Sequence, residues 1–258
     1  MKGKPIDHAF AAYKIDKQQG IIRITGNRDQ TMKLRKRDID DIVKKQYISD
    51  EAVDAGLLLL DKRLNDETIP QQEKITVYPV ANCRLIMAGQ ENVERGKFIT
   101  IMPRHMAMTD FDEIQEAVHS GEQPTDADAG HFTLVSNLFC DDNECNVFET
   151  FGPYRNEECL LTSNGKKLVK LLCNASNNPV VVKCIDVCLQ EENECGAIAF
   201  GLAIQLCFYY HEGGLNTRFL EVRQHLLSCL RQNALVDFPH IGGEDDKPNE
   251  NVSFSITI

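Results

Sequence analysis

The chain has 258 residues, of which 42% are hydrophobic and 26% charged, with a net charge of -11 at pH 7. This length and apolar content predict one folded domain with a sizeable core rather than a disordered chain. Because phosphate binding needs a basic surface, the acidic balance speaks against nucleic acid as a partner. It favours instead proteins or substrate tails that are basic.

Secretion and membrane insertion are not expected. The sequence has no apolar run near the roughly 20 residues that cross a bilayer, and its start lacks the apolar stretch of a signal peptide. We therefore expect an intracellular protein, nuclear or cytoplasmic, whose ten cysteines are mostly free thiols. No CxxC or HxxxH pattern completes a metal set, so we expect no metal and no cofactor.

The first half of the chain is predicted to hold a helix and three strands. Residues 1–46 are polar, and their basic run at 33–37 is followed by acids, which indicates a solvated helix face. A nuclear-localisation or nucleic-acid patch is the alternative there. Ser49 can cap a helix with an apolar stripe, and strands are expected at 75–80, 84–88 and 98–102.

The second half is predicted to hold strands and then helices. An acidic, loop-rich stretch at 103–130 precedes the rest. Strands at 131–139 and 146–151 are followed by a helix at 166–173 and an apolar strand at 180–187. Two helices, 195–210 and 217–231, come last. The order of helix, strands and then helices predicts an α+β domain. The acidic end is predicted to be a flexible tail or an added edge strand.

The most informative stretch for chemistry is the junction before the helix at 195–210. A buried strand ends in a polar turn, and the pair Cys195-Gly196 opens an apolar helix. Unpaired N–H groups at a helix start lower the pKa of a thiol and can bind an oxyanion, so Cys195 is a candidate nucleophile. Gly196 would allow a substrate backbone to approach closely, and the Gln190 amide is a candidate second oxyanion donor. The alternative, that Cys195 is one ordinary buried thiol among ten, stays open on this pattern.

A thiol nucleophile needs a base and a group that orients it. Among seven histidines, His131 is distinctive because it starts an alternating strand directly after a loop. If the next strand pairs with it as a hairpin, Glu149 can accept the ring N–H of His131 and fix its tautomer. An ordinary strand-edge His and a solvated Glu are the competing interpretations.

These residues, taken in order, resemble a known protease family. The order His131, Glu149, Gln190, Cys195 is similar to that of the Ulp-type (SUMO/sentrin-specific, ubiquitin-like-protein) cysteine proteases and the related adenoviral protease. The transposon-derived members look most alike. The resemblance spans residues 47–239 and covers the segments Tyr47–Glu51, His131-Phe132, Phe148–Phe151, Glu194–Ala203 and Arg223–Leu230.

The resemblance implies a papain-like fold, with a central mixed sheet flanked by helices and the nucleophile at a helix N-terminus. It implies a protease domain at 47–239 between a polar extension (1–46) and an acidic tail (240–258). It also implies a protein substrate, such as a ubiquitin-like modifier or its conjugate, cut at a peptide or isopeptide bond by a triad of Cys195, His131 and Glu149. Phe132 would line the substrate tunnel where the family has Trp.

The sequence also departs from the family pattern. Glu149 stands where Asp is usual, although the adenoviral relative uses Glu too. Gln190 lies one residue closer to Cys195 than usual, and the chain has no Trp. A protease-fold module that has lost catalysis and binds a modifier or partner is therefore the alternative function.

Overall fold

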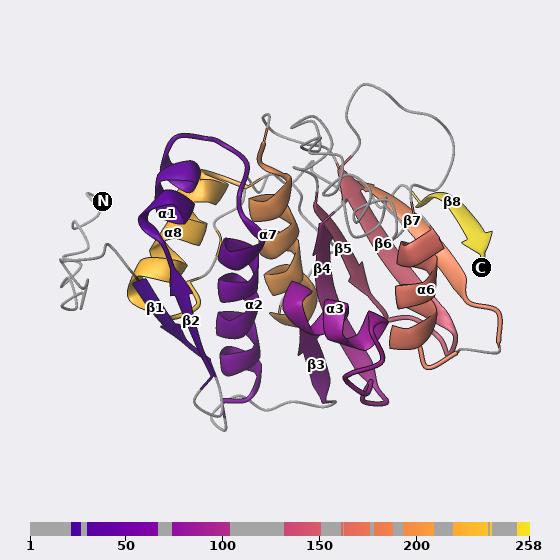
Figure 1. The fold of residues 1–258 in the computed structure, drawn as a ribbon. Helices are drawn as coiled ribbons and strands as arrows, with labels where there is room; N and C mark the ends of the chain where they lie inside the picture. The colour runs from indigo at the N-terminus through magenta and orange to yellow at the C-terminus, as the bar shows by residue number, and fades with distance from the viewer. Residues whose placement is uncertain are drawn as a thin grey trace, which may run out of the picture.

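The computed structural model describes residues 22–26, 30–66, 74–103, 132–150, 161, 163–175, 178–187, 193–208, 219–236, 238 and 252–258. Figure 1 shows helices packed on both sides of one large sheet, with a small hairpin at one end of the molecule. The elements in chain order are β1 (Ile22–Thr25), β2 (Thr31–Leu34), α1 (Lys36–Val43), α2 (Asp50–Leu64), β3 (Ile75–Tyr78), α3 (Val80–Met87), β4 (Lys97–Pro103), β5 (Phe132–Ser136), β6 (Glu144–Thr150), α6 (Ser163–Leu172), β7 (Val181–Val187), α7 (Cys195–Phe208), α8 (Val222–Gln232) and β8 (Val252–Thr257).

The large sheet is mixed and has the strand order β3-β4-β5-β6-β7-β8. The pairs β3–β4 and β6–β7 are parallel, and the other neighbours are antiparallel. Alternate side chains along a strand point to opposite faces, so β4 sends Ile99 and Ile101 toward α2 and α7, while Phe98 and Met102 face α3 and α6. The expected α+β architecture, with a mixed sheet flanked by helices, is confirmed.

Two local predictions are corrected by tertiary contacts. The segment 84–88, expected to be a strand, forms the end of helix α3 and its C-cap, Ala88. Pro79 fixes the entry to this helix, and the carboxylate of Asp54 accepts the N–H groups of Val80 at 2.5 Å and Ala81 at 3.2 Å. A cap from 26 residues away thus favours a helix where the local apolar run resembles a strand.

Helix α2 is buried on more than the single predicted stripe. Ser49 caps it as expected, accepting the N–H of Ala52 at 3.3 Å. Every residue from Ala52 to Leu60 is buried, because α2 contacts the β1–β2 hairpin on one side and α7 on the other. Because α2 has a second buried face, its apolar residues do not follow the single stripe that the sequence pattern predicts.

The described parts of both terminal segments pack against this body. Ile24, Leu34 and Ile42 are at most 2% exposed and share the core of α2 and α7. At the other end, β8 pairs antiparallel with β7 as an edge strand. The boundaries at residues 47 and 239 stay a prediction.

All eight described cysteines are free thiols, as expected. Within the described ranges, every helix is too short or too polar to cross a bilayer.

Candidate active site

The candidate nucleophile lies at the first residue of a buried helix. Cys195 opens α7 and is 5% exposed. The amide of Ile198 donates to the Glu194 carbonyl at 2.9 Å, which closes the first helical turn. Asn193 reverses the chain just before it with a left-handed φ of 63°, a conformation that Asn tolerates better than most residues. The predicted helix-start position of Cys195 is confirmed.

Hydrogen bonds and a positive charge around the Cys195 sulfur oppose the effect of burial on its pKa. Burial is the larger influence and raises the pKa of Cys195 above its ordinary value. Backbone N–H groups of Phe132 and Gly196 donate to the thiol, and the positive charge of Arg223 acts in the same direction, so all three favour the thiolate and lower its pKa. The site thus holds an anion-binding arrangement around a thiol that is shielded from water.

A close contact between β5 and α7 fixes the relative position of the thiol and its donor. A Cβ on Gly196 would lie 2.9 Å from a ring carbon of Phe132 and 3.5 Å from the Cβ of Ile48. The absence of a side chain therefore lets the Phe132 ring pack directly on α7. Phe132 itself is 2% exposed, so both residues have a packing role here, and their substrate-binding role stays a prediction.

Arg223 is a site residue that the sequence reasoning missed. It projects from α8, is 6% exposed, and donates to the carbonyl of Asn193 and, at 3.5 Å, to the carbonyls of Asp41 and Ile42. It ties the turn before Cys195 to the end of α1. The sequence signal that could have indicated Arg223 is a charged residue among the apolar positions of α8, between Val222 and Leu226.

The remaining predicted site residues are described only in part. His131 and Gln190 lie outside the described residues. Glu149 belongs to β6, where its backbone pairs with Asp186 of β7, but its side chain is not described. The hairpin on which its role depends is confirmed, because β5 and β6 pair antiparallel with Leu134 opposite Phe148.

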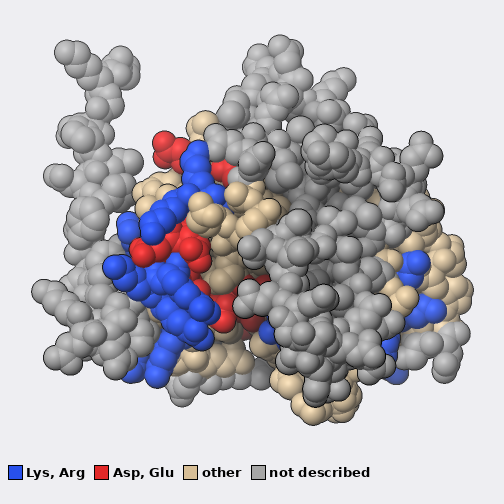
Figure 2. Space-filling view, turned by 45° about the horizontal axis from the view of Figure 1, so that its top comes forward, with Lys and Arg blue, Asp and Glu red and all other residues tan. Residues whose placement is uncertain are grey.

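A hollow and a basic face lie next to the nucleophile turn. The hollow, of about 440 Å³, is lined by residues of α1, α8 and the turn, among them Lys45, Glu194 and Arg223. The amide side chain of Asn193 donates to the Lys45 carbonyl at 3.2 Å. Figure 2 shows Lys and Arg side chains gathered over the hairpin and α1, with acidic side chains beside them. The face beside the candidate site is therefore more basic than the net charge implies.

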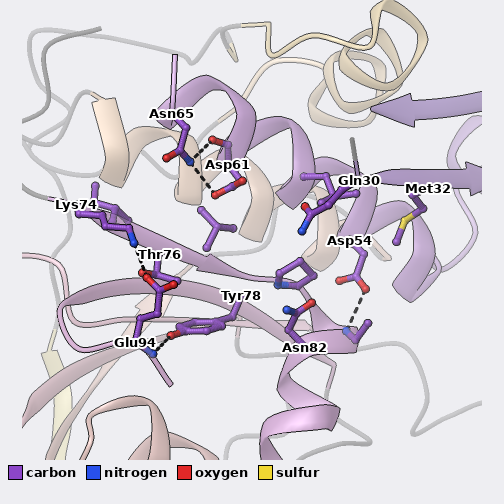
Figure 3. A pocket seen from close by; sticks show the side chains of 15 residues that line it. Gln30, Met32, Asp54, Asp61, Asn65, Lys74, Thr76, Tyr78, Asn82 and Glu94 are labelled. Carbon is purple, nitrogen blue, oxygen red and sulfur yellow. Dashed lines mark hydrogen bonds and ion pairs between the residues drawn. The ribbon is translucent and has the colours of Figure 1, made fainter. Parts of the chain in front are cut away.

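A second hollow lies between α2 and β3 and has no lining residue in common with the thiol site. It measures about 390 Å³, and Figure 3 shows Asp54 and Asp61 of α2 on one side and Tyr78 and Glu94 on the other. Burial raises the pKa of Asp54 to about 6, although the N–H groups that it accepts oppose the shift. Asp54 already serves as the cap of α3, so we assign it a structural role.

The described residues hold no group of three or more His, Cys, Asp or Glu side chains arranged to bind a metal ion.

Comparison with known proteins gives structural matches alone. No family model matches the sequence, and no curated protein matches it. Among solved structures, the chain is similar to the C-terminal Ulp1 protease domain in complex with Smt3, the yeast ortholog of SUMO. The identity is 9% and the TM-score 0.48, over 90% of this chain and 99% of that chain.

Two further solved structures match at a similar level. One is the SUMO protease Ulp1 with its catalytic cysteine oxidized to a sulfinic acid, with 9% identity and a TM-score of 0.47 over 83% of this chain and 90% of that one. The other is a de-sumoylating protease, with 8% identity and a TM-score of 0.47 over 83% and 91%. At this level of identity, the contacts of Cys195 and the order of the sequence motifs are the stronger basis for a function.

Proposed function

We propose that this chain is a cysteine-type peptidase that hydrolyses peptide or isopeptide bonds, with Cys195 as its nucleophile. The observation that carries the proposal is the environment of the sulfur. It receives backbone N–H groups from two different elements, β5 and α7, and lies within the field of the buried Arg223 cation. Such donors stabilise a thiolate, and after attack the same helix start can stabilise the oxyanion.

We assign His131 as the base and Glu149 as its partner. His131 directly precedes Phe132, whose amide N–H reaches the Cys195 sulfur, so the base is one residue from a backbone group that touches the nucleophile. Glu149 is assigned because it lies on β6, the strand that pairs antiparallel with β5, and His131 directly precedes β5 in the sequence.

These roles define the following reaction. His131 takes the thiol proton, and the Cys195 thiolate attacks the substrate carbonyl. The Cys195 amide and the Gln190 side chain stabilise the oxyanion. His131 then protonates the leaving amine, and water releases the acyl group from the sulfur. Glu149 holds the imidazolium throughout.

The proposed substrate is a ubiquitin-like modifier or its conjugate. The resemblance of the ordered motifs to Ulp-type proteases supports this choice. We place Phe132 and Gly196 beside the substrate tail, and the basic face over α1 fits an acidic surface on the bound protein. A nuclear or cytoplasmic location is part of the same proposal.

The deciding experiment is covalent labelling by a ubiquitin-like modifier that carries a C-terminal electrophile. The intact chain is expected to form one adduct at Cys195, and Cys195→Ala none. Cys207→Ser is the matched control, because Cys207 is a thiol of the same helix, and it should label normally. His131→Ala should slow turnover of a modifier-amide substrate by about 10²–10⁴-fold, the usual contribution of a general base. Labelling that persists in Cys195→Ala contradicts the proposal.

A second function, a binding module without catalysis, is favoured by one observation. Burial leaves the pKa of Cys195 raised and its side chain almost wholly covered. A thiol in that state is a poor nucleophile unless an imidazolium or a structural opening offsets the burial. Tight binding of a modifier without any adduct at Cys195 would identify this function.

A further inference from the structure

Two thiols on the far side of the sheet from α7 form a hydrogen-bonded pair. Cys145 lies in β6, is 0% exposed, and belongs to the core between the sheet, α3 and α6. Cys173 directly follows the last residue of α6, Leu172, and packs against the same core. The two side chains share a hydrogen bond in which the Cys145 thiol is the donor.

Solvent reaches only one member of this pair. Cys173 is partly exposed and lines an open hollow of about 640 Å³ with Lys74, Arg95 and Lys97. The acidic residues Asp141, Asp142 and Glu144 line the hollow as well. A small polar oxidant can therefore reach Cys173 from this hollow, whereas Cys145 is wholly covered.

The hydrogen bond also makes the two sulfurs chemically unequal. It lowers the pKa of Cys173, against the effect of burial, because a thiolate there accepts the bond. The same bond and burial raise the pKa of Cys145 well above its ordinary value. A partly exposed thiol whose pKa is lowered, beside a covered second thiol, is the arrangement typical of an oxidisable cysteine and its resolving partner.

We propose that Cys173 and Cys145 form an oxidation site, at which a hydroperoxide oxidises Cys173 and Cys145 converts the product to a disulfide between β6 and the end of α6. This site is separate from Cys195 and does not depend on the proposed peptidase activity.

The chemistry balances with hydrogen peroxide as the oxidant. The Cys173 thiolate attacks one peroxide oxygen, an S–O bond forms as the O–O bond breaks, and the departing oxygen leaves as water after taking up a proton. The Cys145 sulfur then attacks the sulfenic sulfur, and the S–O bond breaks to release a second water. Two thiols lose two electrons in total, and the peroxide gains them.

Two neighbouring cysteines, Cys140 and Cys184, are the alternative sites of oxidation in this part of the core. Cys140 and Cys184 lie close enough to influence the charge state of Cys145, yet they are 8% and 1% exposed. Cys140 also lies close enough to Cys173 to feel its charge. Because Cys140 and Cys184 are both more covered than Cys173, they should react with peroxide later.

The test is disulfide mapping of the full chain after brief exposure to limiting hydrogen peroxide, in a Cys195→Ala background that removes the proposed nucleophile. Trypsin releases residues 171–183, whose one cysteine is Cys173, and residues 105–155, which carry Cys140 and Cys145. Cleavage after Glu144 separates the latter two. The expected product joins Cys145 to Cys173. A link from Cys173 to any other cysteine, or oxidation of Cys184 ahead of Cys173, overturns the proposal.

Two matched variants separate the steps. In Cys145→Ser the resolving thiol is gone, so a sulfenic-acid probe should label Cys173 more strongly than in Cys140→Ser. Cys140→Ser should keep the disulfide. If Cys145→Ser fails to fold, disulfide mapping of the chain with Cys145 intact still shows whether Cys145 and Cys173 become linked. Equal labelling of Cys173 in both variants would show that Cys145 does not resolve it.

Discussion

Adding one methyl group at Gly196 should disturb the thiol more than the fold. In Gly196→Ala, the new Cβ would stand 2.9 Å from the Phe132 ring, whereas ordinary contact begins near 3.4 Å. The ring is fully buried and cannot swing into solvent, so β5 or the start of α7 must move by a few tenths of an ångström. Overpacking of this kind costs about 1–3 kcal/mol, and the helix gains at most about 1 kcal/mol from Ala. We expect a net loss of about 0–2 kcal/mol in the free energy of unfolding.

The functional effect follows from the Phe132 amide, which donates to the Cys195 sulfur. Displacing β5 lengthens that hydrogen bond, so the pKa of Cys195 should rise and its alkylation by iodoacetamide at pH 7 should slow by about tenfold per unit of pKa. Alkylation rates across a pH series, read by mass spectrometry at Cys195, measure this directly.

Gly201→Ala is a matched control in the same helix. Its Cβ would also stand 2.9 Å from a phenylalanine ring, that of Phe219, and Gly201 lies more than one turn further along α7. Both variants should lose similar stability in urea unfolding, but only Gly196→Ala should slow the alkylation of Cys195. Equal slowing in both variants, or none in either, would refute the link between the Phe132–Gly196 contact and the thiol.

Three further predictions concern other parts of the molecule. Because the folded pKa of Asp54 is about 6 against 3.8, the native state binds the extra proton, and stability falls as pH rises through that window. Relative to Asp54→Asn, the parent chain should lose about 2 kcal/mol between pH 4 and 7, with Asp61→Asn as the control and a pH-independent difference as the contrary result. Arg223→Met should shift Cys195 alkylation to higher pH more than Arg223→Lys does, since only the former removes the charge. Unchanged pH profiles of alkylation would show that the Arg223 charge does not affect the thiol. Deleting residues 252–258 removes the β8 ladder and two partly buried isoleucines, which should cost about 2–4 kcal/mol in urea unfolding, and an unchanged midpoint would show that β8 is dispensable.

Local sequence patterns predicted most of the secondary structure that surrounds the site. A capping serine placed the start of α2, and an apolar run opened by a Cys-Gly pair placed α7, because these signals act within one or two turns of chain. The sequence pattern also predicted strands at β5 and β6, and their antiparallel pairing, which was a condition for the proposed role of Glu149, is present in the structure.

Features that depend on distant residues could not be found this way. The segment 84–88 carries an apolar run that resembles a strand, yet it is helical because Asp54 caps it. Arg223 is separated by 30 residues from Asn193, whose carbonyl it binds, and the pairing of Cys145 with Cys173 needs α6 to pack on β6. No periodicity encodes such contacts.

Local patterns were enough to predict that a thiol opens a buried helix, since helix starts and apolar runs are local properties of the chain. The neighbours of that thiol, which are the amide of β5, the cation of α8 and the layers that keep water away, follow only from how distant segments pack. Electrostatic influence and burial depend on distance through space, which the order of residues does not fix until the chain has packed.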